Sequence, residues 1–146
     1  MESKTKRLLM LAEAIAGWST CVRYQVGAII TLRDRIISTG YNGSAPGAVH
    51  CRDHFAEVDD LTMALEHHEW ASKYEIHAEM NALLFAAREG IAVEGATLIT
   101  TMSPCLACSK AIIQAGIVKV YYKNLYSETD FGVFKNSPVQ IERIEE

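Results

Sequence analysis

Two short motifs constrain this chain of 146 residues more than any other feature, because their metal-binding side chains must meet in the fold. The first motif is His77-Ala78-Glu79, and the second is Pro104-Cys105-Leu106-Ala107-Cys108. Each stands at the start of a segment with helical spacing. Cysteines three positions apart share one face of a first helical turn, where the positive helix end favours thiolates. Two thiolates and one imidazole are three ligands for a tetrahedral ion.

Three protein ligands with one open position are typical of a catalytic zinc ion, whereas a structural zinc ion has four. Zinc lowers the pKa of water in the open position towards ~7. Glu79 follows His77 by two residues and is placed to move protons as a general acid and base. A C-x-x-C motif alone is often a redox pair or half of a structural zinc site. The two motifs together, each before a helix, favour catalysis.

The apolar pattern along the chain predicts an α/β fold. Helical spacing covers residues 4–18, 60–73, 78–88 and 103–114, and short apolar runs predict strands at 26–30, 35–40, 96–101, 117–122 and 139–144. We expect the first two strands to form a hairpin, residues 40–47 to form a glycine-rich loop, and Pro104 to take the first helical position. The order of elements, with an optional helix before the last strand, predicts a three-layer α/β/α sandwich with a mixed, roughly five-stranded central sheet. We expect residues 1–146 to form one domain.

Composition excludes several classes of protein. Fourteen basic and eighteen acidic residues give a net charge of −4, which argues against binding of nucleic acid but permits a small anionic ligand. We expect no contact with a membrane, since no apolar run reaches ~18 residues. Glu13 interrupts the apolar N-terminal segment, so we expect no signal peptide and a cytoplasmic protein with four reduced cysteines.

Four segments together resemble a known family. They are Ser19-Thr20-Cys21-Val22-Arg23, Gly40-Tyr41-Asn42-Gly43, Ile76–Ala82 and Ser103–Cys108. The chain resembles the cytidine deaminase superfamily and, within it, the phage-type deoxycytidylate (dCMP) deaminases. The H-x-E and P-C-x-x-C motifs specify only the zinc deaminase superfamily, and the first two segments specify the nucleotide branch. The resemblance implies a cytidine deaminase-like fold and hydrolytic deamination of dCMP to dUMP, which supplies thymidylate synthesis.

The resemblance also implies roles for individual residues. His77, Cys105 and Cys108 would bind the catalytic zinc ion, and Glu79 would shuttle protons. Three further residues would bind substrate: Asn42 the deoxyribose, Arg23 the 5′-phosphate, and Tyr126 the region between phosphate and base. A planar guanidinium suits a phosphate. Without the resemblance, a single arginine is usually a surface charge, and a tyrosine after a strand usually packs.

Phage relatives carry a second, structural zinc ion, and the corresponding ligands here would be Cys21, Cys51, His67 and Glu75. His67 and Glu75 are eight residues apart, about two helical turns, so one bent or continuous helix would bring them to the same side. The alternative is two buried free cysteines beside a solvated His67. His50 and His68 are rival ligands.

Family members are often hexamers that dCTP activates and dTTP inhibits. The resemblance extends both properties to this chain, with Tyr41 and Gly43 in the 40–47 loop as candidate effector or interface residues. Phe85 and Arg88, three apart on one helix face, are further candidates. They would equally suit core and solvent positions.

Other functions fit part of the pattern. The zinc chemistry would also suit dCTP, cytidine, guanine or an adenosine in tRNA, although the acidic balance argues against RNA. A non-enzymatic alternative is an interaction module whose fold is stabilised by structural zinc. Glu79 argues against it, because a structural zinc ion needs no adjacent general acid.

Overall fold

The structure is a computed structural model that describes residues 3–145. Its centre is a five-stranded mixed sheet in the order β2-β1-β5-β6-β7. The strands are β1 (Gly27–Leu32), β2 (Arg35–Tyr41), β5 (Thr97–Met102), β6 (Lys119–Asn124) and β7 (Gln140–Arg143). Strand β1 runs antiparallel to β2 and β5, while β5, β6 and β7 are parallel.

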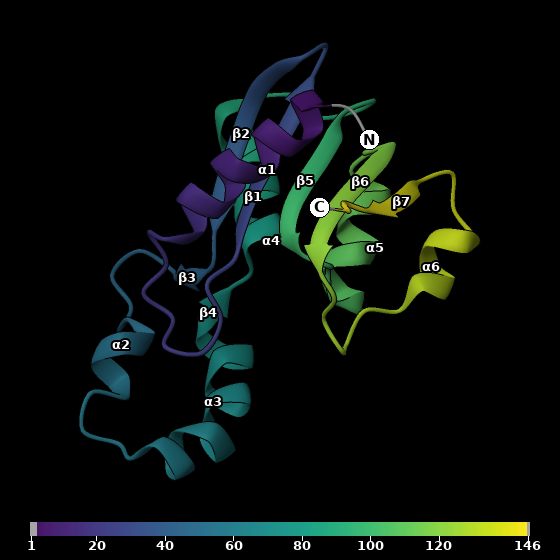
Figure 1. Cartoon of the computed structure of the whole chain (residues 1–146). Coiled ribbons are helices and arrows are strands. Elements are labelled where there is room, and N and C mark those ends of the chain that lie inside the picture. The colour runs from purple at the N-terminus through teal and green to yellow at the C-terminus, as the bar shows by residue number, and fades with distance from the viewer. Residues whose placement is uncertain (1–2, 146) are drawn as a thin grey trace.

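Helices cover both faces of this sheet (Figure 1). Helix α1 (Ser3–Ala16) packs on β1 and β5 from one side, and α4 (Ala78–Glu89) and α5 (Leu106–Gln114) lie on the other. The alternation of side chains along a strand explains the two cores. Leu98 packs into the cluster formed with α4 and α5, while its neighbour Ile99 packs with Leu9 of α1. The predicted three-layer α/β/α sandwich is confirmed.

A smaller unit, which we call the arm, extends from one end of the sheet and comprises residues 43–76 (Figure 1). It contains a two-stranded sheet of β3 (Gly43–Ser44) and β4 (Glu75–Ile76), and the helices α2 (Cys51–His54) and α3 (Asp60–Tyr74). Asp59 caps α3 by accepting a hydrogen bond of 2.7 Å from the Thr62 N–H. The arm has its own core around Phe55 and Trp70.

The hairpin of β1 and β2 was predicted, and Arg33 and Asp34 form its turn in the left-handed region. The prediction of a loop over 40–47 was wrong in part, because β2 continues to Tyr41 and β3 pairs with β4. Strand β2 extends one residue further than its sequence pattern indicates because Tyr41 pairs with Gly27 of β1.

The helix predicted over 103–114 begins later, at Leu106. Pro104 therefore precedes the helix and does not take its first position. Cys105 is the N-cap residue, since its Sγ accepts a hydrogen bond from the Cys108 N–H.

The optional helix before the last strand is α6 (Phe131–Lys135). Within residues 3–145, no helix has both the length and the apolar character to cross a membrane.

Candidate active site

The first group of potential metal ligands lies at the N-terminal ends of α4 and α5, on the face of the sheet opposite α1. His77 is the N-cap of α4, and Cys105 is the N-cap of α5. His77 Nδ1 lies 3.4 Å from the Sγ atoms of both Cys105 and Cys108. In a tetrahedral zinc site with ordinary bond lengths, nitrogen and sulfur ligands are about 3.5 Å apart. The donor set and its spacing therefore fit zinc.

This group has three members, and no other His, Cys, Asp or Glu among the described residues joins it. We call it the first cluster. Helix α5 points its N-terminus at the cysteines, which favours negative charge there. Hydrogen bonds from the Cys108 thiol and then from His77 lower the pKa of Cys105 to about 4. The Cys105 sulfur in turn raises the pKa of His77. The cluster thus favours a thiolate that a cation would stabilise.

Glu79 lies in the first turn of α4 and is only 4% exposed. Burial raises the pKa of its carboxyl group to about 7. The Thr100 hydroxyl lies 3.5 Å from Glu79 Oε1, but its shorter hydrogen bond, 2.9 Å, goes to the carbonyl of Met102. Thr100 is therefore only a weak hydrogen-bond partner of the Glu79 carboxyl group.

A cavity of about 440 Å³ connects the first cluster to the arm. This volume lies within the range of pockets that bind small molecules. His77, Glu79 and Cys105 line the cavity, and so do the three residues expected to bind substrate, Arg23, Asn42 and Tyr126. The structure thus brings together, in one cavity, residues that are spread over more than one hundred positions of the sequence.

The side chain of the buried Asn42 forms most of its possible hydrogen bonds within the protein. Its Oδ1 accepts a hydrogen bond of 2.9 Å from the Val26 N–H, and its Nδ2 donates to the Tyr24 carbonyl at 2.7 Å and to Glu75 Oε2 at 3.4 Å. Both amide protons are used, and Oδ1 retains one lone pair. Asn42 is therefore fixed in place and can still accept one hydrogen bond from a ligand hydroxyl.

Arg23 and Tyr126 both contact the ring of Tyr24. The Arg23 guanidinium is 5.8 Å from the centre of the Tyr24 ring, and Tyr126 packs edge-on against that ring. Within residues 3–145, no carboxylate forms an ion pair with Arg23. The Tyr126 hydroxyl donates a hydrogen bond to Glu128. An unpaired cation on a cavity wall is suited to an anionic ligand.

The arm and the loop before β1 together form a second group, which we call the second cluster: Cys21 from the loop, and Cys51, His67 and Glu75 from the arm. His67 Nε2 lies 3.3 Å from Cys21 Sγ and 3.4 Å from Glu75 Oε1. That Oε1 atom is buried and accepts no hydrogen bond. A buried carboxylate oxygen that accepts no hydrogen bond is unfavourable, and a bound cation would relieve this. Two sulfurs, one imidazole and one carboxylate are a complete ligand set for zinc.

The alternative for this cluster matches the structure only in part: Cys21 and Cys51 are buried and free of disulfides, but His67 is buried, not solvated. His67 and Glu75 do not lie in one bent or continuous helix, because α3 ends at Tyr74 and Glu75 begins β4. Of the rival ligands, His68 is exposed and pairs with Glu128, and His50 lies 3.5 Å from the hydroxyl of Thr20.

The candidate effector or interface residues lie elsewhere. Tyr41, Gly43, Phe85 and Arg88 do not line the cavity. Tyr41 is 39% exposed and contacts Trp18 edge-on, while Phe85 is 49% exposed on α4. These four residues are available to a partner, and their roles remain predictions.

Two further residues line the cavity: His68 of α3, which the sequence suggested only as a rival metal ligand, and Glu128 in the loop after β6, which no sequence pattern indicated. Their side chains form an ion pair of 2.9 Å. The only hint in the sequence is that Glu128 follows Tyr126 by two positions, since neither residue belongs to a motif.

Comparison with known proteins gives a consistent match. The family model described as the cytidine and deoxycytidylate deaminase zinc-binding region matches residues 2–124. The deoxycytidylate deaminase of Enterobacteria phage T4 is 39% identical over 170 aligned positions, which cover 94% of this chain and 88% of that protein.

Solved structures agree with the sequence matches. The dCMP deaminase of cyanophage S-TIM5, in complex with dCMP and dUMP, has a TM-score of 0.80 and 32% identity, and the match covers 99% of both chains. A bifunctional deaminase and reductase from Thermotoga maritima has a TM-score of 0.69 at 21% identity, over 96% of this chain and 36% of that one. This last likeness concerns the fold alone.

Proposed function

Because this chain belongs to the cytidine and deoxycytidylate deaminase family, we propose that it is a deoxycytidylate deaminase, which converts dCMP and water to dUMP and ammonia. One observation carries this proposal. A single cavity joins the first cluster and Glu79 to the unpaired Arg23. The reacting base and the phosphate of one nucleotide can therefore be bound together.

In this proposal His77, Cys105 and Cys108 hold a catalytic zinc ion, as the spacing of their donor atoms allows. Bound there, zinc acts as a Lewis acid that makes water a nucleophile near neutral pH. The residues of the family signature have these same places in zinc deaminases in general.

Glu79 moves the protons of the reaction. Hydroxide adds to C4 of the cytosine and the C4–N4 bond breaks; of the two protons of water, one ends on N3 of the product base and the other on the leaving amine, which departs as ammonia. A buried carboxyl group with a pKa of about 7 can accept a proton from water and return it to the amine near neutral pH. No oxidant or reductant is needed.

The remaining cavity residues position the nucleotide. Arg23 binds the 5′-phosphate, Asn42 accepts a hydrogen bond from a deoxyribose hydroxyl, and Tyr126 lies beside the phosphate and the base. Support for these roles comes from the free charge of Arg23 and the open lone pair on Asn42 Oδ1.

The second cluster binds a structural zinc ion, so we expect two zinc ions per chain. The unpartnered Glu75 Oε1 among three buried ligands supports this assignment. All four cysteines are free of disulfides and belong to one of the two clusters, as expected for a protein of a reducing cytoplasm.

Regulation and assembly follow from the family resemblance alone. We propose a homo-oligomer, with a hexamer favoured, that dCTP activates and dTTP inhibits. The positions of the exposed Tyr41, Phe85 and Arg88 and of the half-buried Gly43, all outside the cavity, are compatible with an effector site or a subunit contact.

The proposed function is tested by measuring ammonia release from dCMP, dCDP, dCTP, deoxycytidine and adenosine side by side, with and without dTTP. We expect the highest kcat/KM for dCMP and inhibition by dTTP. Equal or better turnover of deoxycytidine would remove the phosphate role of Arg23, and turnover of adenosine alone would overturn the proposed substrate. Metal analysis of the same sample should give about two zinc ions per chain.

A further inference from the structure

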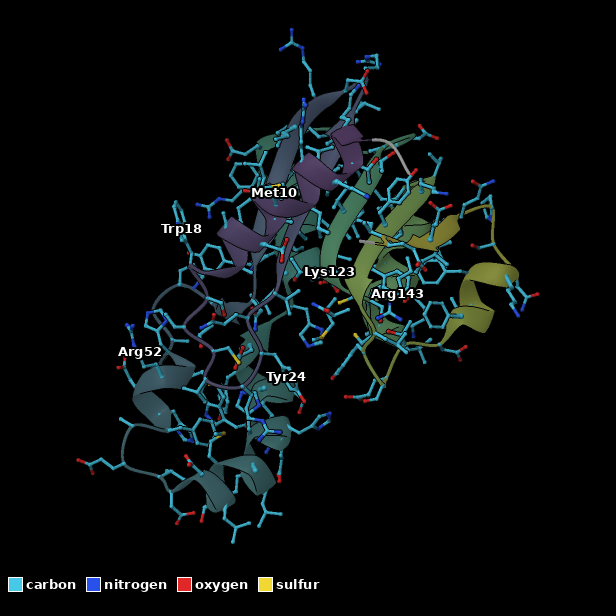
Figure 2. The ribbon with its side chains drawn as sticks, viewed as in Figure 1. Met10, Trp18, Tyr24, Arg52, Lys123 and Arg143 are labelled. Carbon is cyan, nitrogen blue, oxygen red and sulfur yellow. The ribbon has the colours of Figure 1, made fainter. Side chains whose placement is uncertain are left out.

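One loop, residues 19–26, takes part in both the second cluster and the substrate cavity. It contributes Cys21 to the cluster and Arg23 to the cavity wall. Figure 2 shows Tyr24, the neighbour of Arg23, at the level of the arm and away from the strands of the central sheet. The two functions are therefore separated by only one residue of backbone.

Backbone hydrogen bonds to sulfur hold this loop on both sides of Arg23. The Val22 N–H donates to Cys51 Sγ, and the Tyr24 N–H donates to Cys21 Sγ, each at 3.4 Å. Because these two N–H groups flank Arg23, the sulfur atoms of the second cluster determine where its backbone lies.

Asn42 provides a second connection from the cluster to the cavity. Its Nδ2 donates to Glu75 Oε2 and to the carbonyl of Tyr24. On the other side of the loop, the Ser19 hydroxyl donates to the Asn42 carbonyl and accepts from the Cys21 N–H. The cluster, the loop and Asn42 thus form one closed network of hydrogen bonds.

A bound metal would strengthen this network. Cysteine ligates metal as the thiolate, and a hydrogen bond to an ionised acceptor is roughly twice as strong as one between neutral groups. A metal would also fix Glu75 through its unpartnered Oε1, while Oε2 holds Asn42. Losing the metal would loosen both connections to the cavity.

We propose that the second cluster positions the phosphate-binding end of the cavity, with Cys51 and Glu75 acting through the loop at Arg23. This inference rests on the proposed function and on a metal at the second cluster. The reacting end has further anchors of its own: although His77 follows Glu75 by two residues, Glu79 and Cys108 belong to α4 and α5, which pack on the sheet. Loss of the second metal should therefore weaken nucleotide binding more than it slows the chemical step.

The test compares Cys51→Ser with the wild type, using dCMP and deoxycytidine as substrates. A matched control is Phe55→Leu, because Phe55 packs in the same core without being a ligand. We expect Cys51→Ser to lose one of two zinc ions per chain. The KM for dCMP should rise about tenfold or more relative to that for deoxycytidine, as expected for weakened hydrogen bonds to charged groups. The kcat for dCMP should fall less than about threefold, and Phe55→Leu should keep the wild-type ratio of KM values.

A Cys51→Ser variant that has lost its second zinc but keeps the wild-type ratio of KM values would overturn the inference. The proposed function is judged separately, by whether the wild type forms dUMP from dCMP at all. Binding of dUMP, measured by calorimetry, gives a readout that needs no turnover. For Cys51→Ser, binding of dUMP should weaken more than binding of deoxyuridine, which shares the deoxyribose contact with Asn42 but has no phosphate.

A second measurement applies if Cys51→Ser does not fold. Coupling between two binding sites is reciprocal. If the second metal raises the affinity for a phosphate ligand by some factor, that ligand must raise the affinity for the second metal by the same factor. The Cys105→Ser variant removes a first-cluster ligand and keeps the second cluster whole. Its zinc affinity is measured by equilibrium competition with a chelator in the presence of dUMP or deoxyuridine. We expect the zinc affinity to be about tenfold higher in the presence of dUMP than in the presence of deoxyuridine. The same zinc affinity with both ligands would contradict the inference.

Discussion

His68 Nε2 lies 2.9 Å from Glu128 Oε2, although sixty positions separate the two residues along the chain. Both line the cavity, and the same Glu128 oxygen accepts a hydrogen bond from the Tyr126 hydroxyl. The Glu128 carboxylate thus already accepts the hydrogen bond of the Tyr126 hydroxyl, and we expect this hydroxyl to lie near the phosphate of the bound nucleotide. Glu128 therefore competes with the phosphate for Tyr126.

Replacing Glu128 by glutamine should strengthen nucleotide binding. A unit charge in a water-like medium contributes about 0.6 kcal/mol at a separation of ~7 Å, so the KM for dCMP should fall about threefold. The KM for deoxycytidine, which carries no phosphate, should not change. Steady-state kinetics with both substrates checks this result, and Glu66→Gln, on the exposed surface of α3, is the control. A higher KM for dCMP would show that the ion pair with His68 helps binding.

The stability of metal-free protein should depend on pH through Glu79. Burial raises the pKa of this group to about 7, whereas an unfolded glutamate titrates near ~4.3. Between these values the folded state keeps a proton that the unfolded state has lost. The contribution of Glu79 is therefore present below ~4.3 and is lost as the pH rises to about 7, by up to about 1.4 kcal/mol per pH unit.

Urea unfolding of metal-free wild type and Glu79→Gln at pH 5 and pH 7 measures this effect. The variant should gain stability relative to the wild type as the pH rises, because glutamine does not ionise. Identical pH dependence in the two proteins would show that Glu79 is not desolvated in the metal-free state.

Gly40 controls how closely α4 approaches the sheet. A Cβ atom there would clash with the Ala78 carbonyl and lie 2.6 Å from the Ala82 nitrogen. Gly40→Ala should therefore destabilise the fold by about 1–3 kcal/mol and weaken zinc binding at the first cluster, since His77 caps α4. Gly43→Ala is the matched control, because a Cβ at Gly43 meets nothing within 4 Å. Denaturant unfolding and zinc content check both variants, and equal midpoints would contradict the expected clash.

The sequence was sufficient for the features that depend on local pattern. The apolar runs that became β1 and β5 are buried along nearly their whole length, and such strands have a strong hydrophobic signal. The spacing of Cys105 and Cys108 likewise places both at the start of one helix. Family resemblance then identified Arg23, Asn42 and Tyr126, which no periodicity distinguishes from surface or packing residues.

Features that depend on distant contacts were not predictable. Strands β3 and β4 have two residues each, too few for a periodic pattern, and they exist because they pair with each other. Glu128 and His68 meet only because the arm and the loop after β6 both reach the cavity. The predicted start of α5 was too early because proline is tolerated both before the N-cap residue and after it. The hydrogen bond from the Cys108 N–H to Cys105 Sγ makes Cys105 the N-cap, so Pro104 lies before the helix.

The most direct test of the proposed chemistry is the conversion of dCMP to dUMP by the wild type and by Glu79→Gln at equal zinc content. The account predicts that the variant binds dUMP as the wild type does but loses about 100-fold to 10,000-fold in kcat, the usual contribution of a general acid and base. Conversion of dCMP by Glu79→Gln at the wild-type rate, with zinc bound, would contradict it.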